Sequence, residues 1–455
     1  MATRLLSILL VLAGLTVAPA AQVRTGPPPE IRALVESVMK AANGSADAWE
    51  AFAQARFAPA LLQQQSRDER AQLHQRIVND LGAVELNGAR REGPDAPLQL
   101  NVKGTKGAGV IVVTIDESAT PRITAVRVEL GVAAPGADRG GAPGPPVNGT
   151  MTSEEIDRGL DGYFTKLAAD EAFSGVALVA KNGVPVFFKA YGFADREKKV
   201  ANTIRTRFNL GSINKAFTQV AIRQLIRDGK LSATDTLGKF FPDYPQVATR
   251  AATIEQLLTH RAGVADFFGP TFDSAPKSQF TSNADYFKLV SGLPPTFAPG
   301  ERNQYCNGCY IVLGAIVEKV SGMAYEKYVA EHVFARAEMT STGYPRSDRP
   351  EPDIALGYTR RGGGGSLQNN IALHGVTGSA AGGGHSTALD LLSYVKAVRA
   401  GKFPGAEPDM GIAGGAPGIN AIVEGRGEWV VIVLSNFDPP SAQQTGTAIA
   451  DALMR

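Results

Sequence analysis

The chain has 455 residues, of which 44% are hydrophobic, so at roughly 150 residues per domain it can form two or three domains. Its 46 basic and 44 acidic side chains leave a formal net charge of +2, without a block of basic residues that could follow a phosphate backbone. This balance excludes nucleic acid as an expected partner.

The N-terminal segment has the pattern of a secretory signal peptide. Arg4 precedes an apolar run from Leu5 to Val17, and small residues follow, so we expect a signal peptide over residues 1–21. An apolar run of about 13 residues is short for a membrane span, which needs roughly 20. The sequence therefore predicts an exported protein, periplasmic or secreted, without a stable membrane anchor.

Residues 27–131 predict a small α+β domain. Helix-like stretches come first, and Ser66 and Glu69 have the spacing of a capping box at the start of the third helix. Three segments rich in β-branched residues follow: PLQLNVKG, GVIVVTIDE and RITAVRVEL. This order of elements resembles the cone-shaped fold of nuclear-transport-factor and cystatin-like domains. We interpret the domain as a packing or docking unit without chemistry of its own.

Residues 132–150 are rich in glycine, proline and alanine, which predicts a linker. Residues 151–455 are expected to form one α+β domain, because hairpin patterns at both of its ends can share one antiparallel sheet faced by helices. The first hairpin turns at Asn182-Gly183. The middle of this domain has a helical pattern and is expected to form a lobe, with a substrate cleft between lobe and sheet.

A possible nucleophile stands at the start of that helical region. Ser212 follows Gly211, and Lys215 lies three residues on, so its amine can reach the serine oxygen. Lysine can take the serine proton only if its pKa falls by roughly 3 units, which costs about 4 kcal/mol. Burial and the helix dipole both favour that fall. The S-x-x-K pattern also occurs at 274–277 and 393–396, so an N-cap serine beside a surface lysine is the alternative.

Tyr305 is the one tyrosine among eleven that begins a Y-x-N pattern. Its segment, TFAPGERNQYCNGCYIVLGAIVEKVSG, resembles a segment of the penicillin-recognising serine hydrolases, which include class C β-lactamases, D-alanyl-D-alanine carboxypeptidases and β-lactamase-like esterases. ATIEQLLTHRAGV and GSAAGGGHSTALDLLSYVKAV resemble further segments of this family in the same order. The resemblance implies a β-lactamase/transpeptidase-like fold, with an antiparallel sheet flanked by helices and a mostly helical lobe.

The resemblance also implies roles for individual residues. Ser212 would be the acylated nucleophile, and Lys215 and Tyr305 would act together as general base. Because a phenol beside an ammonium can have a lowered pKa, Tyr305 is expected to accept the serine proton. Asn307 would orient the carbonyl side of the substrate.

The family's third motif, K-T-G or H-x-G, is replaced here by Ile412-Ala413-Gly414. The missing cation and hydroxyl normally hold the carboxylate of a β-lactam or of a terminal D-alanine, so their loss argues against both substrates. Gly414 and Gly415 still permit close approach of a substrate, and the N–H of Gly415 aligns with the second oxyanion donor. We expect hydrolysis of a small ester, amide or peptide. The alternative is a catalytically impaired binding or scaffold protein.

The only two cysteines, Cys306 and Cys309, flank Asn307. C-x-x-C by itself suggests a dithiol redox site, but the thioredoxin-like context is missing. We therefore expect two small packing side chains, with a disulfide as the alternative in an oxidising compartment. The sequence has no H-E-x-x-H motif and no P-loop, so neither a metal nor another cofactor is expected. It leaves the oligomeric state open.

Overall fold

The structure is a computed structural model that describes residues 28–91, 97–105, 108–116, 118, 120–130, 144–349, 351–360 and 366–454. The expected signal peptide and the first part of the expected linker lie outside these residues. No helix in the described ranges is both long enough and apolar enough to cross a membrane.

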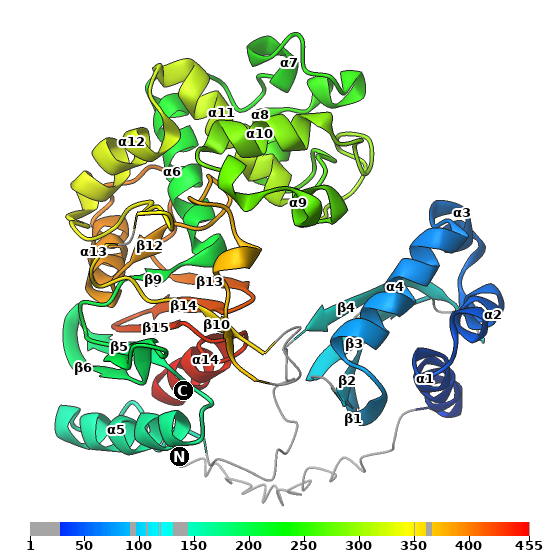
Figure 1. The fold of residues 1–455 in the computed structure, drawn as a ribbon, viewed down its shortest axis with the longest axis horizontal. Helices are drawn as coiled ribbons and strands as arrows, with labels where there is room; N and C mark the ends of the chain where they lie inside the picture. The colour runs from blue at the N-terminus through cyan, green and yellow to red at the C-terminus, as the bar shows by residue number, and fades with distance from the viewer. Residues whose placement is uncertain are drawn as a thin grey trace, which may run out of the picture.

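The N-terminal unit consists of helices followed by an antiparallel sheet in the order β1-β2-β3-β4 (Figure 1). The helices are α1 (Pro29–Ala42), α2 (Ala46–Arg56), α3 (Pro59–Gln64) and α4 (Arg67–Asp80), and the strands are β1 (Val84–Arg90), β2 (Leu98–Gly104), β3 (Ala108–Ile115) and β4 (Ile123–Leu130). The predicted capping box of Ser66 and Glu69 is present at the start of α4.

Two features of this unit differ from the sequence prediction. The helical pattern of ADAWEAFAQARFAPALLQQQ predicts a single second helix, but the structure breaks it at Phe57 and Ala58, because Pro59 disfavours helical backbone in the residue before it. An additional strand, β1, runs through VELNGAR, where a glycine and several polar residues mask the alternation of apolar and polar side chains that is usual in a strand.

The C-terminal unit is built on a five-stranded antiparallel sheet in the order β13-β14-β15-β5-β6. The strands are β5 (Gly175–Lys181), β6 (Val184–Tyr191), β13 (Met410–Ala416), β14 (Ile419–Arg426) and β15 (Trp429–Ser435). β15 pairs with β5, so the first and last hairpins share one sheet, as their patterns predict. Helices α5 (Ser153–Ala169) and α14 (Gln443–Leu453) cover one face through a core that includes Phe164 and Ile449.

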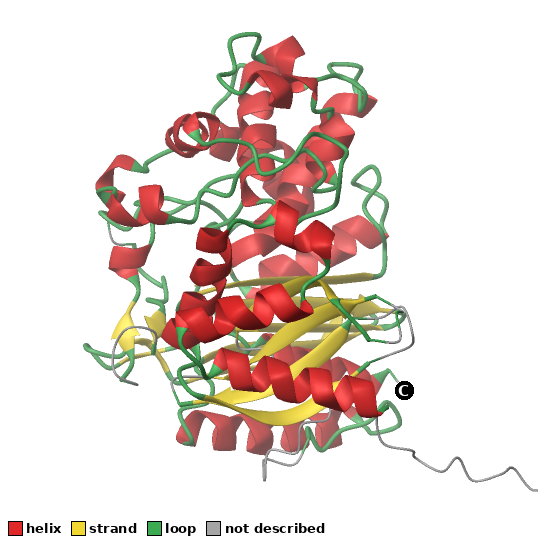
Figure 2. Ribbon diagram, turned by 90° about the vertical axis from the view of Figure 1, so that its right-hand side faces the viewer, coloured by secondary structure: helices red, strands yellow, loops and turns green. Residues whose placement is uncertain are grey.

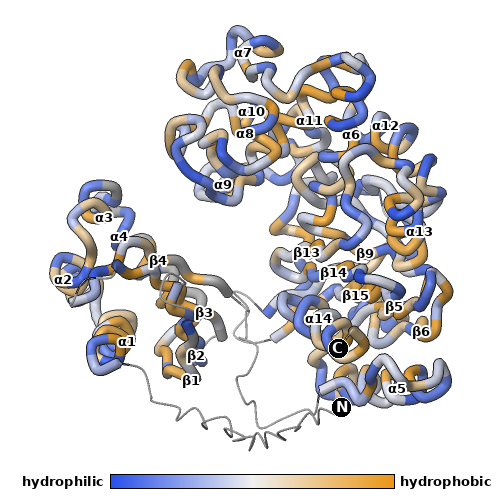
Figure 3. The backbone as a smooth tube through the Cα atoms, turned by 180° about the vertical axis from the view of Figure 1, so that it is seen from behind, coloured by the Kyte–Doolittle hydropathy of each residue, from blue (hydrophilic) through white to orange (hydrophobic). Residues whose placement is uncertain are grey.

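A helical lobe lies beyond the other face of the sheet, and Figure 2 shows the strands between layers of helices. Its helices are α6 (Asn214–Arg227), α7 (Leu237–Phe240), α8 (Ile254–Leu258), α9 (Pro270–Ser274), α10 (Asn283–Gly292), α11 (Asn307–Ser321), α12 (Tyr325–Val329) and α13 (Ala388–Arg399). Residues 308–317 of α11 are all buried, and the trace through this helix is hydrophobic (Figure 3). The lobe therefore packs around α11 as its central helix.

Short strand pairs connect the lobe to the sheet. They are β7 (Phe193–Asp195) with β8 (Val200–Ala201), β9 (Phe208–Asn209) with β12 (His385–Ser386), and β10 (Tyr358–Thr359) with β11 (Gln368–Asn369). β9 leads directly into the start of α6, which lies beside the edge strand β13 (Figure 1).

Candidate active site

The segment that carries Ser212 is a tight turn between β9 and α6. Gly211 has a positive φ of 50°, which glycine adopts without strain, and its N–H donates to Asn209 Oδ1 at 2.9 Å. Residues 211–213 form a 3₁₀ turn, and the α-helix begins at Asn214. Ser212 therefore precedes the α-helix, where backbone N–H groups lack helical partners.

Lys215 is buried behind Ser212, with only 6% of its surface exposed. Its Nζ lies 3.0 Å from Ser212 Oγ, 2.7 Å from Asn307 Oδ1 and 2.6 Å from the carbonyl oxygen of Ala381. Burial lowers the pKa of Lys215 to about 7, although the nearby Asp266 carboxylate acts in the opposite direction. A neutral amine donates to the two carbonyl oxygens and leaves its lone pair for the serine proton.

Tyr305 lies on the other side of the serine. Its hydroxyl donates to Ser212 Oγ at 2.6 Å, and its ring stacks on His260 with centroids 4.9 Å apart. Desolvation beside Ser212 raises the Tyr305 pKa to about 12, although 55% of the residue is exposed. The expectation of a lowered pKa is therefore wrong, because desolvation outweighs the hydrogen bond to Ser212, which acts to lower the pKa.

Asn307 begins α11 and is held at both ends of its amide. Its Oδ1 accepts from Lys215, and its Nδ2 donates to Asp266 Oδ2 at 2.7 Å. The other Asp266 oxygen accepts the N–H of Phe268 at 3.0 Å. Asp266 thus links the Asn307 amide to the loop that carries Phe267 and Phe268. The sequence prediction missed it, and the signal that could have found it is an acid three positions after Gly263 of the HRAG segment.

Cys306 and Cys309 form a disulfide, so the expectation of two separate packing side chains is wrong. Both are buried, and Cys306 Sγ accepts the N–H of Cys309 at 2.9 Å, which caps the first turn of α11. The Cys306 N–H donates to His260 Nδ1 at 3.1 Å. These contacts anchor the chain on both sides of Asn307 and directly after Tyr305.

Strand β13 approaches the serine through its glycines. A Cβ on Gly414 would lie 1.9 Å from the Leu210 carbonyl oxygen and 2.7 Å from Ser212 N, so only glycine allows this contact. A Cβ on Gly211 would lie 2.9 Å from Gly415 N, which places that N–H beside the serine turn. The structure therefore brings all six candidate residues together.

The side chains of Ile412 and Ala413 point to opposite faces of β13. Ile412 packs against the core of the lobe, and Ala413 packs against the core beneath α5 and α14. Ile412 also lines a hollow of about 260 Å³ together with Arg223 and Glu407. Arg223 is exposed, so water screens its charge. Strand β13 thus presents neither a cation nor a hydroxyl next to the glycines.

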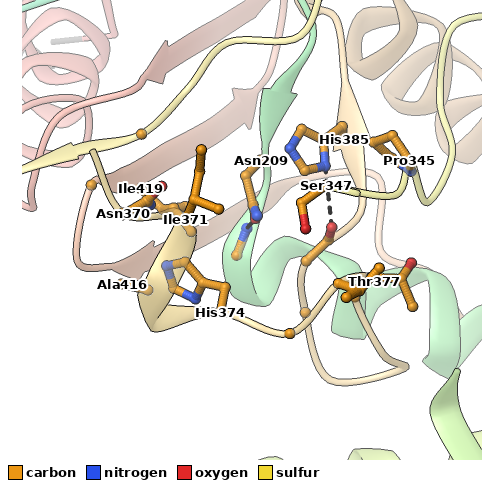
Figure 4. Close-up of a pocket in the computed structure, with 18 of the residues that line it drawn as sticks. Asn209, Pro345, Ser347, Asn370, Ile371, His374, Thr377, His385, Ala416 and Ile419 are labelled. Atoms are coloured by element: carbon orange, nitrogen blue, oxygen red, sulfur yellow. Dashed lines mark hydrogen bonds between the residues drawn. The ribbon is translucent and has the colours of Figure 1, made fainter. Parts of the chain in front are cut away.

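A cavity of about 390 Å³ opens beside Ser212, Asn307 and Gly415. Its lobe side is aromatic, and the part shown in Figure 4 is bordered by Asn209, His374 and His385. Burial lowers the pKa of His374, and it lowers the pKa of His385 to about 4, so both imidazoles are neutral at neutral pH. The cavity is the concave surface next to the reactive groups.

Comparisons with known proteins agree with this geometry. The family model described as Beta-lactamase matches residues 160–417. The putative penicillin-binding protein PbpX of Bacillus subtilis is 34% identical over 190 residues, which is 42% of this chain and 46% of that protein. Penicillin-binding protein 4* of the same organism is 30% identical over 204 residues, 44% of this chain and 45% of its own length. The chain thus spans less than half the length of these curated relatives.

Solved structures match a larger share of the chain. A penicillin-binding protein from Bacillus halodurans superposes with a TM-score of 0.57 at 29% identity, covering 63% of this chain and 99% of the other. EstCE1, described as a hydrolase with promiscuous acyltransferase activity, has a TM-score of 0.53 at 19% identity, with coverage of 67% and 99%. The second of these shows likeness of fold alone.

Proposed function

The chain belongs to the Beta-lactamase family, and from that premise we propose that it is an exported serine hydrolase that cleaves an ester or amide through an acyl-Ser212 intermediate. The position of the serine oxygen carries this proposal. It lies 3.0 Å from the amine of Lys215 and 2.6 Å from the hydroxyl of Tyr305, so a proton acceptor and a proton donor both touch the attacking atom.

We assign the base to Lys215 and a donor role to Tyr305. Ser212 Oγ attacks the carbonyl carbon while its proton moves to the neutral Lys215 amine. The carbonyl oxygen becomes an oxyanion that the N–H groups of Ser212 and Gly415 stabilise. The bond to the leaving group then breaks, and the leaving oxygen or nitrogen takes a proton from the lysine, directly or through the Tyr305 hydroxyl. Water attacks the acyl-enzyme by the same route and releases the acid.

The Ser212 proposal is tested by labelling the purified protein with a fluorophosphonate probe. We expect a label that is lost in Ser212→Ala and kept in Ser274→Ala. Ser274 has the same S-x-x-K spacing, but its hydroxyl donates to the Pro270 carbonyl oxygen and the Lys277 amine donates to the Phe272 carbonyl oxygen. Absence of a Ser212-dependent label would refute the enzyme and favour the binding or scaffold alternative.

The choice of substrate needs a second measurement. We expect the protein to hydrolyse nitrophenyl esters and to leave a chromogenic cephalosporin intact, because Ile412 and Ala413 provide no partner for the cephalosporin carboxylate. Rapid cephalosporin turnover would contradict the importance assigned to these two residues.

Export is a separate part of the proposal. The signal-peptide pattern of residues 1–21 supports a periplasmic or secreted protein. Expressed in a bacterium with its native N-terminus, the chain should appear in the periplasm or medium with a new N-terminus at residue 22. A cytosolic protein with an intact Met1 would contradict export.

A further inference from the structure

The cavity beside Ser212 is enclosed by the segment 370–377, which crosses from the sheet to the lobe (Figure 4). At the sheet end, the Asn370 side chain donates to the Pro417 carbonyl oxygen at 2.8 Å. At the lobe end, the N–H of Thr377 donates to the Phe280 carbonyl oxygen at 3.2 Å, and the Tyr286 hydroxyl donates to the Thr377 carbonyl oxygen at 2.8 Å. The wall is therefore anchored on both sides and forms a cavity that exists before a ligand binds.

The lining of the cavity is largely apolar. Aromatic and aliphatic side chains come from the lobe, from segment 370–377 and from β14: Phe267, Phe268, Phe272, Ile371, Val376 and Ile419. The volume of about 390 Å³ falls in the range of roughly 300–1,000 Å³ that accommodates drug-sized ligands. An acetyl group would leave most of this space to water.

The charged residues that line the cavity are each paired with an opposite charge. Lys198 lies 3.0 Å from Asp195, Arg346 lies 2.7 Å from Asp348, and Glu351 lies 2.7 Å from Arg207. A ligand carboxylate entering the cavity would therefore meet cations that already have an anionic partner, and it would lose hydration for little electrostatic gain.

From this lining we infer that the cavity is the acyl subsite, and that the natural acyl group is uncharged, apolar and considerably longer than acetyl. The inference rests on the proposed function, because a carbonyl placed between Ser212 and the N–H of Gly415 directs one of its substituents into the space that both residues line. Transfer of each further methylene from water into this space favours binding, so the rate of acylation should grow with the length of the acyl chain.

The test compares nitrophenyl esters that share one leaving group. We expect kcat/KM for the octanoate to exceed that for the acetate at least tenfold, and to exceed by a similar factor that of an ester of the same length ending in a carboxylate. A preference for the acetate, or equal use of the two long esters, would overturn the inference.

A matched pair of variants locates the effect. Ile371→Lys should reduce the octanoate preference at least fivefold and improve use of the carboxylate-ended ester, since it places a cation in the wall. Leu373→Lys, in the same short 3₁₀ helix but outside the cavity lining, should leave both preferences unchanged. Both side chains are partly exposed, at 45% and 42%, so either lysine can be accommodated by the fold. Equal effects of the two variants would contradict the assignment of Ile371 to the wall of the acyl subsite.

A binding experiment separates failure of the acyl-subsite inference from failure of the proposed hydrolase function. In Ser212→Ala, which lacks the nucleophile, octanamide should bind at least tenfold more tightly than acetamide in calorimetry. Equal binding would overturn the acyl subsite even if Ser212 in the unmodified protein reacts with the fluorophosphonate. Tight octanamide binding by a protein without a reactive Ser212 would retain the subsite and refute only the hydrolase.

Discussion

Replacement of Lys215 by methionine should change the stability of the protein in opposite directions at low and at high pH. The folded structure lowers the Lys215 pKa from 10.5 to about 7. At about 1.36 kcal/mol per pH unit, holding the protonated lysine in the fold costs about 5 kcal/mol below pH 7. As the pH rises from about 7 toward 10.5, the unfolded chain binds the additional proton, so this cost declines to zero.

The methionine variant has no amine to protonate, so the cost of holding an ammonium in the fold disappears. It also lacks the three polar contacts of the lysine amine. The contacts with Ser212, Asn307 and Ala381 together contribute about 3 kcal/mol at about 1 kcal/mol each. Lys215→Met should therefore be about 2 kcal/mol more stable than the wild type at about pH 6, and about 2 kcal/mol less stable at about pH 9.5. The sign should reverse near pH 8, although the variant is inactive throughout.

Urea unfolding followed by tryptophan fluorescence measures this difference. The two tryptophans lie in different units, so a Trp49→Phe background leaves Trp429 of β15 as the reporter of the catalytic unit. Lys239→Met, which removes a lysine with 57% of its side chain exposed, serves as control and should shift stability by less than about 0.5 kcal/mol at both pH values. A methionine variant less stable than the wild type at about pH 6 would show that the fold stabilises the ammonium, and would refute the assignment of Lys215 as base.

Three further predictions concern the same site. The rate of fluorophosphonate labelling of Ser212 should rise through about pH 7 and stay level to about pH 10, because the reaction requires a neutral lysine and the tyrosine pKa lies higher. A rise that continues to pH 10 would contradict the assignment of Lys215 as the base. Gly414→Ala should reduce labelling by at least a hundredfold, since its methyl group would meet backbone atoms. Gly411→Ala on the same strand meets only the Glu424 side chain and should retain most of the labelling. Equal losses would refute the close contact between Gly414 and the serine turn. Asp266→Ala should lower kcat roughly tenfold by freeing the Asn307 amide, and unchanged kcat would show that the hydrogen bond does not position it.

The parts of the site that could be predicted from sequence are those fixed by local spacing. Ser212 and Lys215 meet because three residues correspond to nearly one helical turn. The closing hairpin and the first strand could be assigned to one sheet from their alternation and turn residues. In the N-terminal unit, by contrast, the helical pattern of residues 46–65 hides the break before α3, which Pro59 imposes on the backbone of Ala58.

The fall in the Lys215 pKa could be predicted from the need for a base and from burial, but the direction of the Tyr305 pKa shift could not, because it depends on how residues distant in the chain pack. Asn307 and Ala381 reach Lys215 across 92 and 166 positions. The sequence favours a lysine ammonium that lowers the tyrosine pKa, but in the packed site burial lowers the Lys215 pKa to about 7 and desolvation raises the Tyr305 pKa to about 12. The disulfide could not be predicted for a similar reason, since the spacing of the two cysteines alone does not fix the backbone angles that bring their sulfurs together.

The isoleucine in the third motif also has a consequence for inhibition in a cell. A β-lactam antibiotic is recognised partly through its carboxylate, and β13 of this protein has Ile412 and Ala413 at the two positions where the family pattern has a cation and a hydroxyl, so it offers that carboxylate no partner. We therefore expect the proposed hydrolase to keep its activity in the presence of a β-lactam antibiotic. A selective inhibitor would need the opposite design, with an uncharged electrophile for Ser212 and a long apolar tail for the adjacent cavity.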